Sequence, residues 1–295
     1  MPPSQTSTGL ESANAVVGGS ASIPVYVISL ADAAIRRQNM TSRLSAAGMA
    51  FRFVDAVDGR TTPVPDTFEG ARVIRGPFGY ESEVACSASH WRVYRMIANG
   101  DADTALILED DAALAEDFAE VVRQALSFKF DIFKLEGFNL AYRRMTIGRI
   151  GKYDVVVTIL PCQGSAAYLI RREAAKRICS LGLIDQGADV IFGDPRLRLR
   201  VLEMEPFCAW QDNETASSVK AQPIVSYSPQ RPGRLEGFLQ STRRKVALAR
   251  VHGPRVLLRL ELKRIRPWGN RAWRIKSGAF ILAVICVIVG LWLYR

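Results

Sequence analysis

Histidine is scarce in this sequence, because the 295 residues include only His90 and His252. Two-metal phosphoesterases need a nucleophile or several histidines around the metals, so this scarcity argues against a metal-dependent phosphoesterase. The five cysteines are an odd number at scattered spacings and form no CxxC pair. They indicate neither a disulfide framework nor a zinc site, and we expect reduced cysteines that pack inside the protein.

The N-terminus lacks the basic start and apolar centre of a signal peptide. Residues 1–22 are rich in Ser, Ala and Gly, a composition that predicts a disordered leader. We therefore expect a chain that is not secreted. Residues 23–230 are enough to bury one substantial core and predict a single globular domain of catalytic size.

Acidic residues are nearly absent from residues 231–276, which contain 14 Lys or Arg and two acids. Residues 1–230 contain 24 and 27, so the net charges of the two regions are about +12 and −3. The overall charge of +10 thus comes from one basic segment. The mildly acidic globular part offers no surface for nucleic acid, and the basic segment lacks the interleaved aromatics of a base-stacking surface.

Residues 277–294 carry no charge. Eighteen helical residues reach roughly 27 Å, so we predict a single transmembrane helix, with a buried core helix as the alternative. The basic flank predicts a C-terminal anchor in the inner (cytoplasmic) membrane, with the globular domain facing the cytoplasm. Within residues 235–263, Gly253-Pro254 interrupts a pattern of cations and apolar residues. This pattern predicts two short amphipathic helices on an anionic membrane surface or, alternatively, packed on the domain.

An acidic triplet, Glu109-Asp110-Asp111, directly follows the apolar run Ala105–Leu108. Side chains alternate along an extended backbone, so Glu109 and Asp111 would share one face and Asp110 would point to the other. Hard divalent ions prefer carboxylate oxygens, so Glu109 and Asp111 are candidates to hold Mn²⁺ or Mg²⁺ beside a sugar-nucleotide diphosphate. The alternative is that Asp110 or Asp111 caps a helix over residues 112–126.

Strands and helices alternate along the globular region. We expect strands at residues 24–30, 51–54, 105–108, 132–135, 155–160, 166–170 and 198–204, helices at 35–47, 81–99, 112–126 and 171–181, and loops at 60–80 and 206–218. This alternation predicts an α/β fold with a largely parallel sheet, covered by helices on both faces. Binding groups would lie at the carboxyl ends of the strands.

Several motifs in this order resemble those of glycosyltransferase family 25, the bacterial lipooligosaccharide galactosyltransferase type. They are Val27–Leu30 with Arg36-Arg37, Gly48–Phe51 and Phe53–Gly59, Glu83–Cys86 with Ser89-His90, Leu108–Asp111, and Gly164–Tyr168 before Arg171-Arg172. The resemblance covers about residues 24–218 and favours the metal site over the helix cap. It implies a GT-A-like, Rossmann-type mixed sheet flanked by helices, a nucleotide-sugar donor, commonly UDP-galactose, and an inverting transfer to a glycan on a lipid carrier.

Donor-binding candidates follow from these motifs. Arg36 and Arg37 would pair with donor phosphates, although a solvated helix face also explains them. Asp55 would accept hydrogen bonds from a ribose or a base, and we prefer it to Asp58, which is followed by a glycine in a common turn pair. The complete set assigned to the donor is Ser29, Arg36, Arg37, Asp55, Glu83, His90 and Asp110, with Glu109 and Asp111 assigned to the metal.

His90 has two interpretations, a contact with phosphate or a structural hydrogen bond. Glu83 precedes it by about two helical turns, so both side chains would lie on one face of a helix. An inverting transfer also needs a base for the acceptor hydroxyl. Either Asp189 or Asp185 could be equivalent to the family's Asp, and Glu136, at the end of its own strand, is a third candidate. We favour Asp189 as the base.

Gln211, Ser217 and Ser218 match a late polar loop of the family that would line the acceptor side, although ordinary polar loop residues would also explain them. Together these features predict a membrane-held glycosyltransferase of lipopolysaccharide or surface-glycan assembly. Its partners would be a nucleotide sugar, a lipid-linked glycan acceptor and an anionic membrane surface. The alternative is a glycosyltransferase-like domain without turnover that serves as a membrane scaffold.

Overall fold

The computed structural model describes residues 23–138, 144–212 and 234–262. The predicted leader, the predicted transmembrane helix at residues 277–294, and Ser217 and Ser218 lie outside the described residues. Within the described ranges, no helix is long and apolar enough to cross a membrane.

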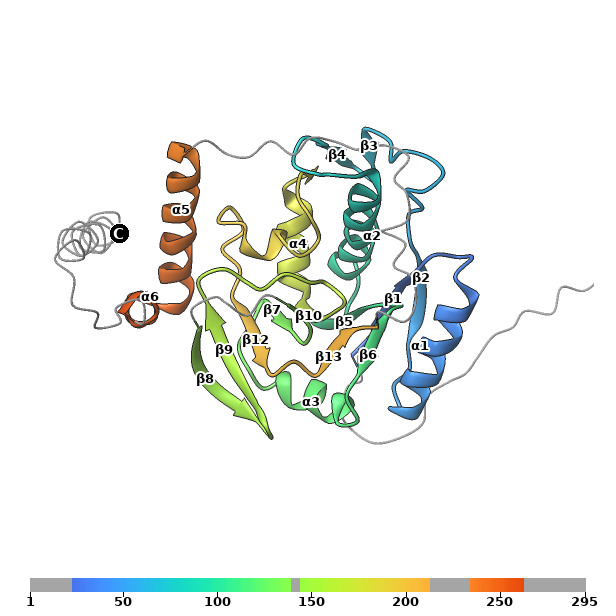
Figure 1. The fold of residues 1–295 in the computed structure, drawn as a ribbon, viewed down its shortest axis with the longest axis horizontal. Helices are drawn as coiled ribbons and strands as arrows, with labels where there is room; N and C mark the ends of the chain where they lie inside the picture. The colour runs from blue at the N-terminus through green and yellow to red at the C-terminus, as the bar shows by residue number, and fades with distance from the viewer. Residues whose placement is uncertain (1–22, 139–143, 213–233, 263–295) are drawn as a thin grey trace, which may run out of the picture.

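A mixed eight-stranded sheet forms the centre of the fold (Figure 1). Its order is β2-β1-β5-β10-β7-β12-β9-β8. The strands are β1 (Val25–Ser29), β2 (Arg52–Asp55), β5 (Thr104–Glu109), β7 (Ile132–Lys134), β8 (Arg144–Ile150), β9 (Tyr153–Thr158), β10 (Ala167–Arg171) and β12 (Val201–Glu205). Strands β2, β1 and β5 run parallel, as do β7 and β12, whereas β10 and β9 are antiparallel to both of their neighbours. The sheet is mixed, as the family resemblance implies, and less parallel than the alternation of elements predicts.

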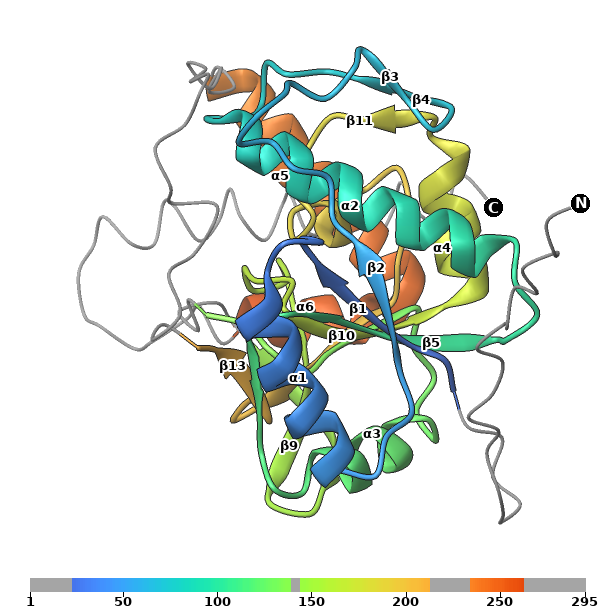
Figure 2. The ribbon, with the colours of Figure 1, turned by 90° about the vertical axis from the view of Figure 1, so that its right-hand side faces the viewer.

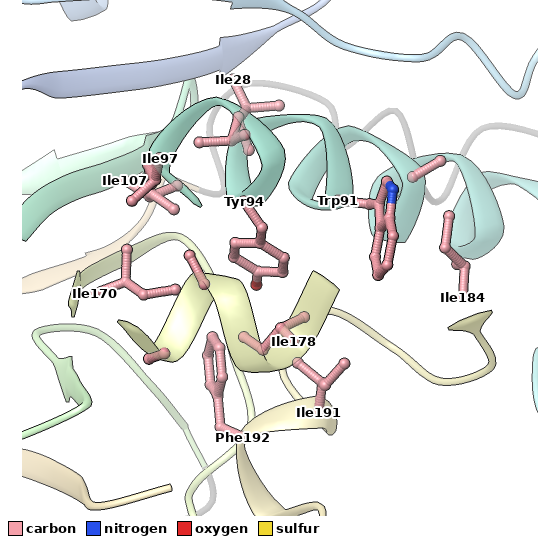
Figure 3. Close-up of a cluster of buried hydrophobic side chains, with 14 of the residues drawn as sticks. Ile28, Trp91, Tyr94, Ile97, Ile107, Ile170, Ile178, Ile184, Ile191 and Phe192 are labelled. Carbon is pink, nitrogen blue, oxygen red and sulfur yellow. The ribbon is translucent and has the colours of Figure 1, made fainter. Parts of the chain in front are cut away.

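Helices cover both faces of the sheet (Figure 2). They are α1 (Ala34–Ala46), α2 (Glu81–Ala98), α3 (Phe118–Ala125), α4 (Arg172–Ser180) and the short 3₁₀ helix η1 (Ile191–Gly193). Successive strand residues point to opposite sides. Ile28 and Ile107 therefore pack into the core beneath α2 and α4 (Figure 3), while Val27 and Leu106 pack into the core beneath α1 and α3.

All seven expected strands are present, and α1, α2 and α4 confirm three of the expected helices. The helix expected over residues 112–126 is wrong in its first part. Ala112–Leu114 form strand β6, which pairs with β13 (Ala209–Gln211), and the helix α3 begins only at Phe118. The partner strand lies far along the chain, so local propensity did not reveal this pairing.

The expected loops also contain short strands. β3 (Thr67–Phe68) and β4 (Ala71–Val73) form a hairpin, and β11 (Leu183–Ile184) extends it to a three-stranded sheet. Strand β8 was not expected from the sequence, because its residues do not alternate cleanly and its register with β9 shifts between Thr146 and Gly148.

The two C-terminal helices are α5 (Arg234–His252) and α6 (Pro254–Leu262), and they separate at the predicted break, where Gly253 has a φ of 91°. Leu257 and Leu260 of α6 are buried, and Leu260 belongs to the core beneath α1 and α3. Lys245 of α5 forms a 3.0 Å ion pair with the buried Glu261. The described part of this segment is therefore packed on the domain through these residues, as the alternative interpretation states.

Candidate active site

A cavity at the carboxyl ends of β1 and β5 is the candidate active site. Ile28 of β1 lies opposite Glu109 of β5, so the two parallel strands end next to each other at the same edge of the sheet. The cavity has a volume of about 100 Å³. Its lining consists of Ile28, Ser29, Leu30, Arg36, Ala56, Val57, Asp58, Gly59, Arg60, Ser82, Ala85, Cys86, Ser89, His90, Glu109, Asp110, Asp111 and Gln211.

The acidic triplet lies inside this cavity in a different arrangement from the one expected. Strand β5 ends at Glu109, and Asp110 and Asp111 form the turn that leads to β6. Alternation along a strand therefore does not apply beyond Glu109, and all three side chains line the same cavity. The helix-cap alternative is wrong, since the residues that follow the triplet form a strand and the N-cap of α3 is Asp117.

Asp110 is the most strongly paired member of the triplet. Ser29 Oγ donates to Asp110 Oδ2 at 2.7 Å, and Arg36 Nη1 donates to Asp110 Oδ1 at 2.9 Å. Arg36 and Asp110 are both well buried, so this ion pair is shielded from solvent. Two donor-binding candidates, Ser29 and Arg36, thus contact a third, Asp110.

Glu109 lies at the end of a chain of hydrogen bonds. Ser165 Oγ donates to Glu109 Oε1 at 2.6 Å, and His90 Nε2 lies 3.2 Å from the same oxygen. His90 Nδ1 lies 2.7 Å from the Tyr168 hydroxyl. Burial alone would raise the pKa of Glu109, but His90, Ser165 and Arg36 outweigh it and hold this pKa below its usual value.

Asp111 contrasts with both neighbours. Its side chain is buried, and its Oδ1 has no hydrogen-bond partner among the described residues. Burial, followed by the charges of Glu109 and Asp110, raises the pKa of Asp111 to about 7. A buried oxygen without a partner costs free energy, and a divalent cation shared with Glu109 would supply both a partner and positive charge. The residues present therefore fit the divalent metal ion that the family implies.

Glu136 and Asp189, two candidate bases, both lie close to Gly164. The Gly164 N–H donates to Asp189 Oδ2 at 3.0 Å, and the Ala166 N–H donates to Glu136 Oε2 at 3.1 Å. A Cβ atom on Gly164 would lie 2.5 Å from Glu136 Oε2, so this close approach requires glycine. Burial raises the pKa of Glu136 to about 7, against the opposing charge of Lys134.

None of the three candidate bases lines the cavity formed by the described residues. Asp189 lies near it, because Asp189 accepts the Gly164 N–H at 3.0 Å and the next residue, Ser165, donates to Glu109 in the cavity. Asp185 is held elsewhere, in an ion pair with Arg196 at 2.9 Å.

Three donor-binding candidates also lie outside the cavity lining. Arg37 donates to the backbone oxygens of Ser29 and Leu30 and forms an ion pair with Asp55, whose side chain is largely exposed. Glu83 accepts a 2.7 Å hydrogen bond from the Gly79 N–H at the start of α2. These contacts stabilise the strand end and the helix start, respectively.

Three residues that were not assigned to the donor or the metal from the sequence also line the cavity. Asp58 lines it and pairs with Arg60, which also lines it, at 2.8 Å. The hydrogen bonds from Arg60 lower the pKa of Asp58 despite partial desolvation. We gave Asp58 little weight because Asp58-Gly59 is a common turn pair. Arg60, directly after this pair, was the signal in the sequence that could have indicated a charged site. Gln211, matched to the family's late loop, also lines the cavity.

The site and fold define a class: an α/β enzyme with carboxylates, a serine and an arginine at the carboxyl ends of parallel strands, where phosphorylated ligands bind. A model of glycosyltransferase family 25 (LPS biosynthesis protein) matches residues 22–182, more than half of the sequence. The chain therefore belongs to glycosyltransferase family 25 and is a glycosyltransferase, for which the family implies a nucleotide-sugar donor and a glycan acceptor.

No curated protein matches this sequence. Among solved structures, the chain is similar to one described as "Crystal Structure of A197 from STIV", with 13% identity, coverage of 72% of this chain and 98% of that chain, and a TM-score of 0.40. A likeness this distant carries no argument about the site.

Proposed function

We propose that this chain is a metal-dependent, inverting glycosyltransferase that moves a sugar from a UDP-sugar to a lipid-linked glycan in lipopolysaccharide or surface-glycan biosynthesis. The observation that carries the proposal is the cluster of Glu109 with the buried Asp110 and Asp111 in one cavity, where Asp111 Oδ1 has no partner among the described residues. Three adjacent carboxylates in one cavity repel one another, and a divalent cation is the partner that relieves this repulsion.

Glu109 and Asp111 would hold Mn²⁺ or Mg²⁺, which when bound neutralises charge on the departing diphosphate. Arg36 lines the cavity and now pairs with Asp110, so a donor phosphate would compete with Asp110 for this guanidinium. Pockets for ligands of this size are about 300–1,000 Å³, so the cavity has to widen to admit a whole nucleotide sugar. Separation of Arg36 from Asp110 is the change we expect.

Asp189 is the base that we propose for the acceptor hydroxyl. Its carboxylate is half-buried and is positioned by the Gly164 N–H at 3.0 Å. Glu136 is the alternative, and its raised pKa of about 7 suits proton transfer near neutral pH. It is more deeply buried than Asp189, so an acceptor hydroxyl reaches it less easily.

We also propose that residues 277–294 anchor the enzyme in the inner membrane, with the domain on the cytoplasmic side. The support is their uncharged sequence and the cationic stretch that precedes them. Because α6 packs on the domain through Leu257 and Leu260, the anchor would hold the whole domain close to the membrane. A lipid-borne acceptor would then be met at a high local concentration.

The test uses full-length protein in detergent with Mn²⁺ and a panel of UDP- and GDP-sugars, UDP-galactose first. Nucleotide release is measured with and without EDTA for the wild type, Asp111→Ala and the exposed control Asp101→Ala. We expect EDTA-sensitive release from one donor, retained in Asp101→Ala. Asp111→Ala should lower it by about 100-fold or more, since even indirect partners of metal ligands are worth 10–100-fold.

EDTA-resistant release that survives Asp111→Ala would refute metal dependence. No release from any donor, even with membrane glycolipid extract added as acceptor, would favour the scaffold without turnover.

A further inference from the structure

A second cleft lies between α5 and the segment that follows η1, and it shares no residue with the active-site cavity. Its volume is about 410 Å³. Figure 1 shows α5 at the end of the molecule that carries β8 and β9. The lining consists of Pro195, Arg196, Arg198, Thr242, Arg243, Val246, Ala247 and Arg250. We call this site the arginine cleft.

Among the residues that the structure describes, the lining of the arginine cleft has four cations and no acid. Arg196 is neutralised by ion pairs with Asp185 and Asp194. Arg198, Arg243 and Arg250 are exposed, and none of them has an acidic partner in the part of the chain that the structure describes. Like charges held together without a counterion repel, so an anion bound among them would be stabilised.

The backbone conformation of Arg198 is uncommon and supports a ligand site at the arginine cleft. Arg198 has a φ of 49°, in the left-handed region that a residue with a Cβ atom rarely adopts. Leu197 and Leu199 on either side are buried, and they hold the strained residue so that its side chain remains at the surface. Backbone strain of this kind persists where the surrounding packing imposes it, and it is frequent at ligand sites.

We propose that the arginine cleft binds the phosphate group of an anionic membrane phospholipid. Guanidinium groups bind phosphate oxygens in pairs, and Val246 and Ala247 add an apolar wall beside them. The cleft borders α5, and the chain continues past α6 into residues 263–276, which add six further cations in sequence. The proposal rests on the membrane location proposed above. Phospholipid phosphates are the most abundant anions at a membrane surface, so a lipid phosphate is the ligand that we propose.

One segment of chain connects the cleft to the active site. Asp189 accepts the Gly164 N–H near the cavity, and Arg196 and Arg198 follow after η1. The ion pair between Arg196 and Asp185 joins the start of this segment, residues 185–198, to a residue near its end. A phospholipid in the cleft would therefore hold the segment that carries the proposed base at the membrane surface.

The test measures phosphate binding by the full chain in neutral detergent. Dihexanoyl-phosphatidylglycerol, dihexanoyl-phosphatidylcholine and inorganic phosphate are titrated by calorimetry at constant ionic strength. The variant is the triple substitution Arg198→Asn, Arg243→Gln and Arg250→Gln, in which Asn tolerates the left-handed backbone. The matched control removes three exposed arginines elsewhere, as R72Q, R123Q and R149Q.

We expect phosphatidylglycerol to bind the wild type and the control alike. In the cleft variant, binding should weaken by about fivefold for each cation lost, thus roughly a hundredfold for three. Binding of inorganic phosphate with the same dependence on the cleft would support a phosphate site but overturn the lipid as its source. Equal losses in the variant and the control, or no loss in either, would overturn the proposal.

Donor turnover by the same variants keeps the two proposals distinguishable. The cleft shares no lining residue with the active-site cavity, so the cleft variant should release nucleotide in detergent at the wild-type rate. Loss of phospholipid binding with turnover intact supports the arginine cleft. Absence of turnover in every protein would count against the glycosyltransferase mechanism and leave the phospholipid titration as an independent result.

Discussion

Replacement of Gly164 by alanine tests whether this glycine keeps Glu136 and Asp189 in place. Gly164 has a φ of 105°, and a Cβ atom there would lie 2.5 and 2.7 Å from the two Glu136 carboxylate oxygens. Gly151 is the matched control, because it also has a positive φ, of 51°, but a Cβ atom there would meet nothing within 4 Å. Both variants thus place a Cβ atom at a positive φ, but Gly164 lies further from the left-handed region than Gly151 and only Gly164 has the clash.

We expect Gly151→Ala to destabilise the protein by about 1–2 kcal/mol, the usual cost of a left-handed residue with a Cβ atom. Gly164→Ala should cost a further 1–3 kcal/mol or so, as overpacking in a buried site does. Chemical denaturation with urea measures both values. The Gly164 segment also positions Ser165 on Glu109, so donor turnover should fall by about 100-fold in Gly164→Ala, as expected for a displacement near 1 Å.

A double variant, Gly164→Ala with Glu136→Ala, separates the clash from the backbone strain. Removal of the Glu136 carboxylate makes room for the new methyl group, so the two substitutions should destabilise less together than the sum of their separate effects. If Gly164→Ala costs no more than Gly151→Ala, or if the two effects in the double variant simply add, the close approach of Gly164 and Glu136 has no energetic consequence and the reasoning is wrong.

Two further predictions concern the same site. Glu136→Gln should change how stability depends on pH: a pKa of about 7 in place of the ordinary 4.5 means that the native state holds this proton more tightly, so the stabilisation from Glu136 is present at pH 4 and is lost as pH rises towards 7. Relative to wild type, the free energy of unfolding of the variant should therefore rise by up to roughly 3 kcal/mol between pH 4 and pH 8. Urea denaturation across this pH range measures it, and the same pH dependence in both proteins would contradict the prediction. Ser165→Ala removes the 2.6 Å hydrogen bond to Glu109 and should weaken Mn²⁺ binding by about 10–100-fold, as measured by electron paramagnetic resonance, whereas the exposed control Ser127→Ala should bind like wild type.

Much of the fold followed from the sequence because its signals are local. The apolar runs of β1 and β5 and the helical periodicity of α2 are properties of adjacent residues, and each element is present where it was expected. The family resemblance extended this to the mixed sheet. The failures share one cause, which is pairing with distant segments. β6 pairs with β13, and neither is recognisable without the other.

The site shows the same division. The acidic triplet at the end of an apolar run was visible in the sequence, which by itself left open whether these residues hold a divalent cation or cap a helix. The different environments of its members were not visible there. Ser29 and Arg36 come from β1 and α1 to pair with Asp110, while Asp111 has no such partner among the described residues. Strand β5 ends at Glu109, so the alternation of side chains along a strand does not extend to Asp110 and Asp111, and all three residues line one cavity.

The sequence by itself thus determined the fold class, the place of the carboxylates and the basic character of the C-terminal region, since each depends on residues that are neighbours in the chain. The tertiary structure decided which charges meet. It brought Gly164 against Glu136 and Asp189 and paired Arg37 with Asp55. It also gathered Arg198, Arg243 and Arg250 into one cleft whose described lining contains no acid. Electrostatic and steric interactions act over a few ångströms in space, and those distances exist only after the chain has folded.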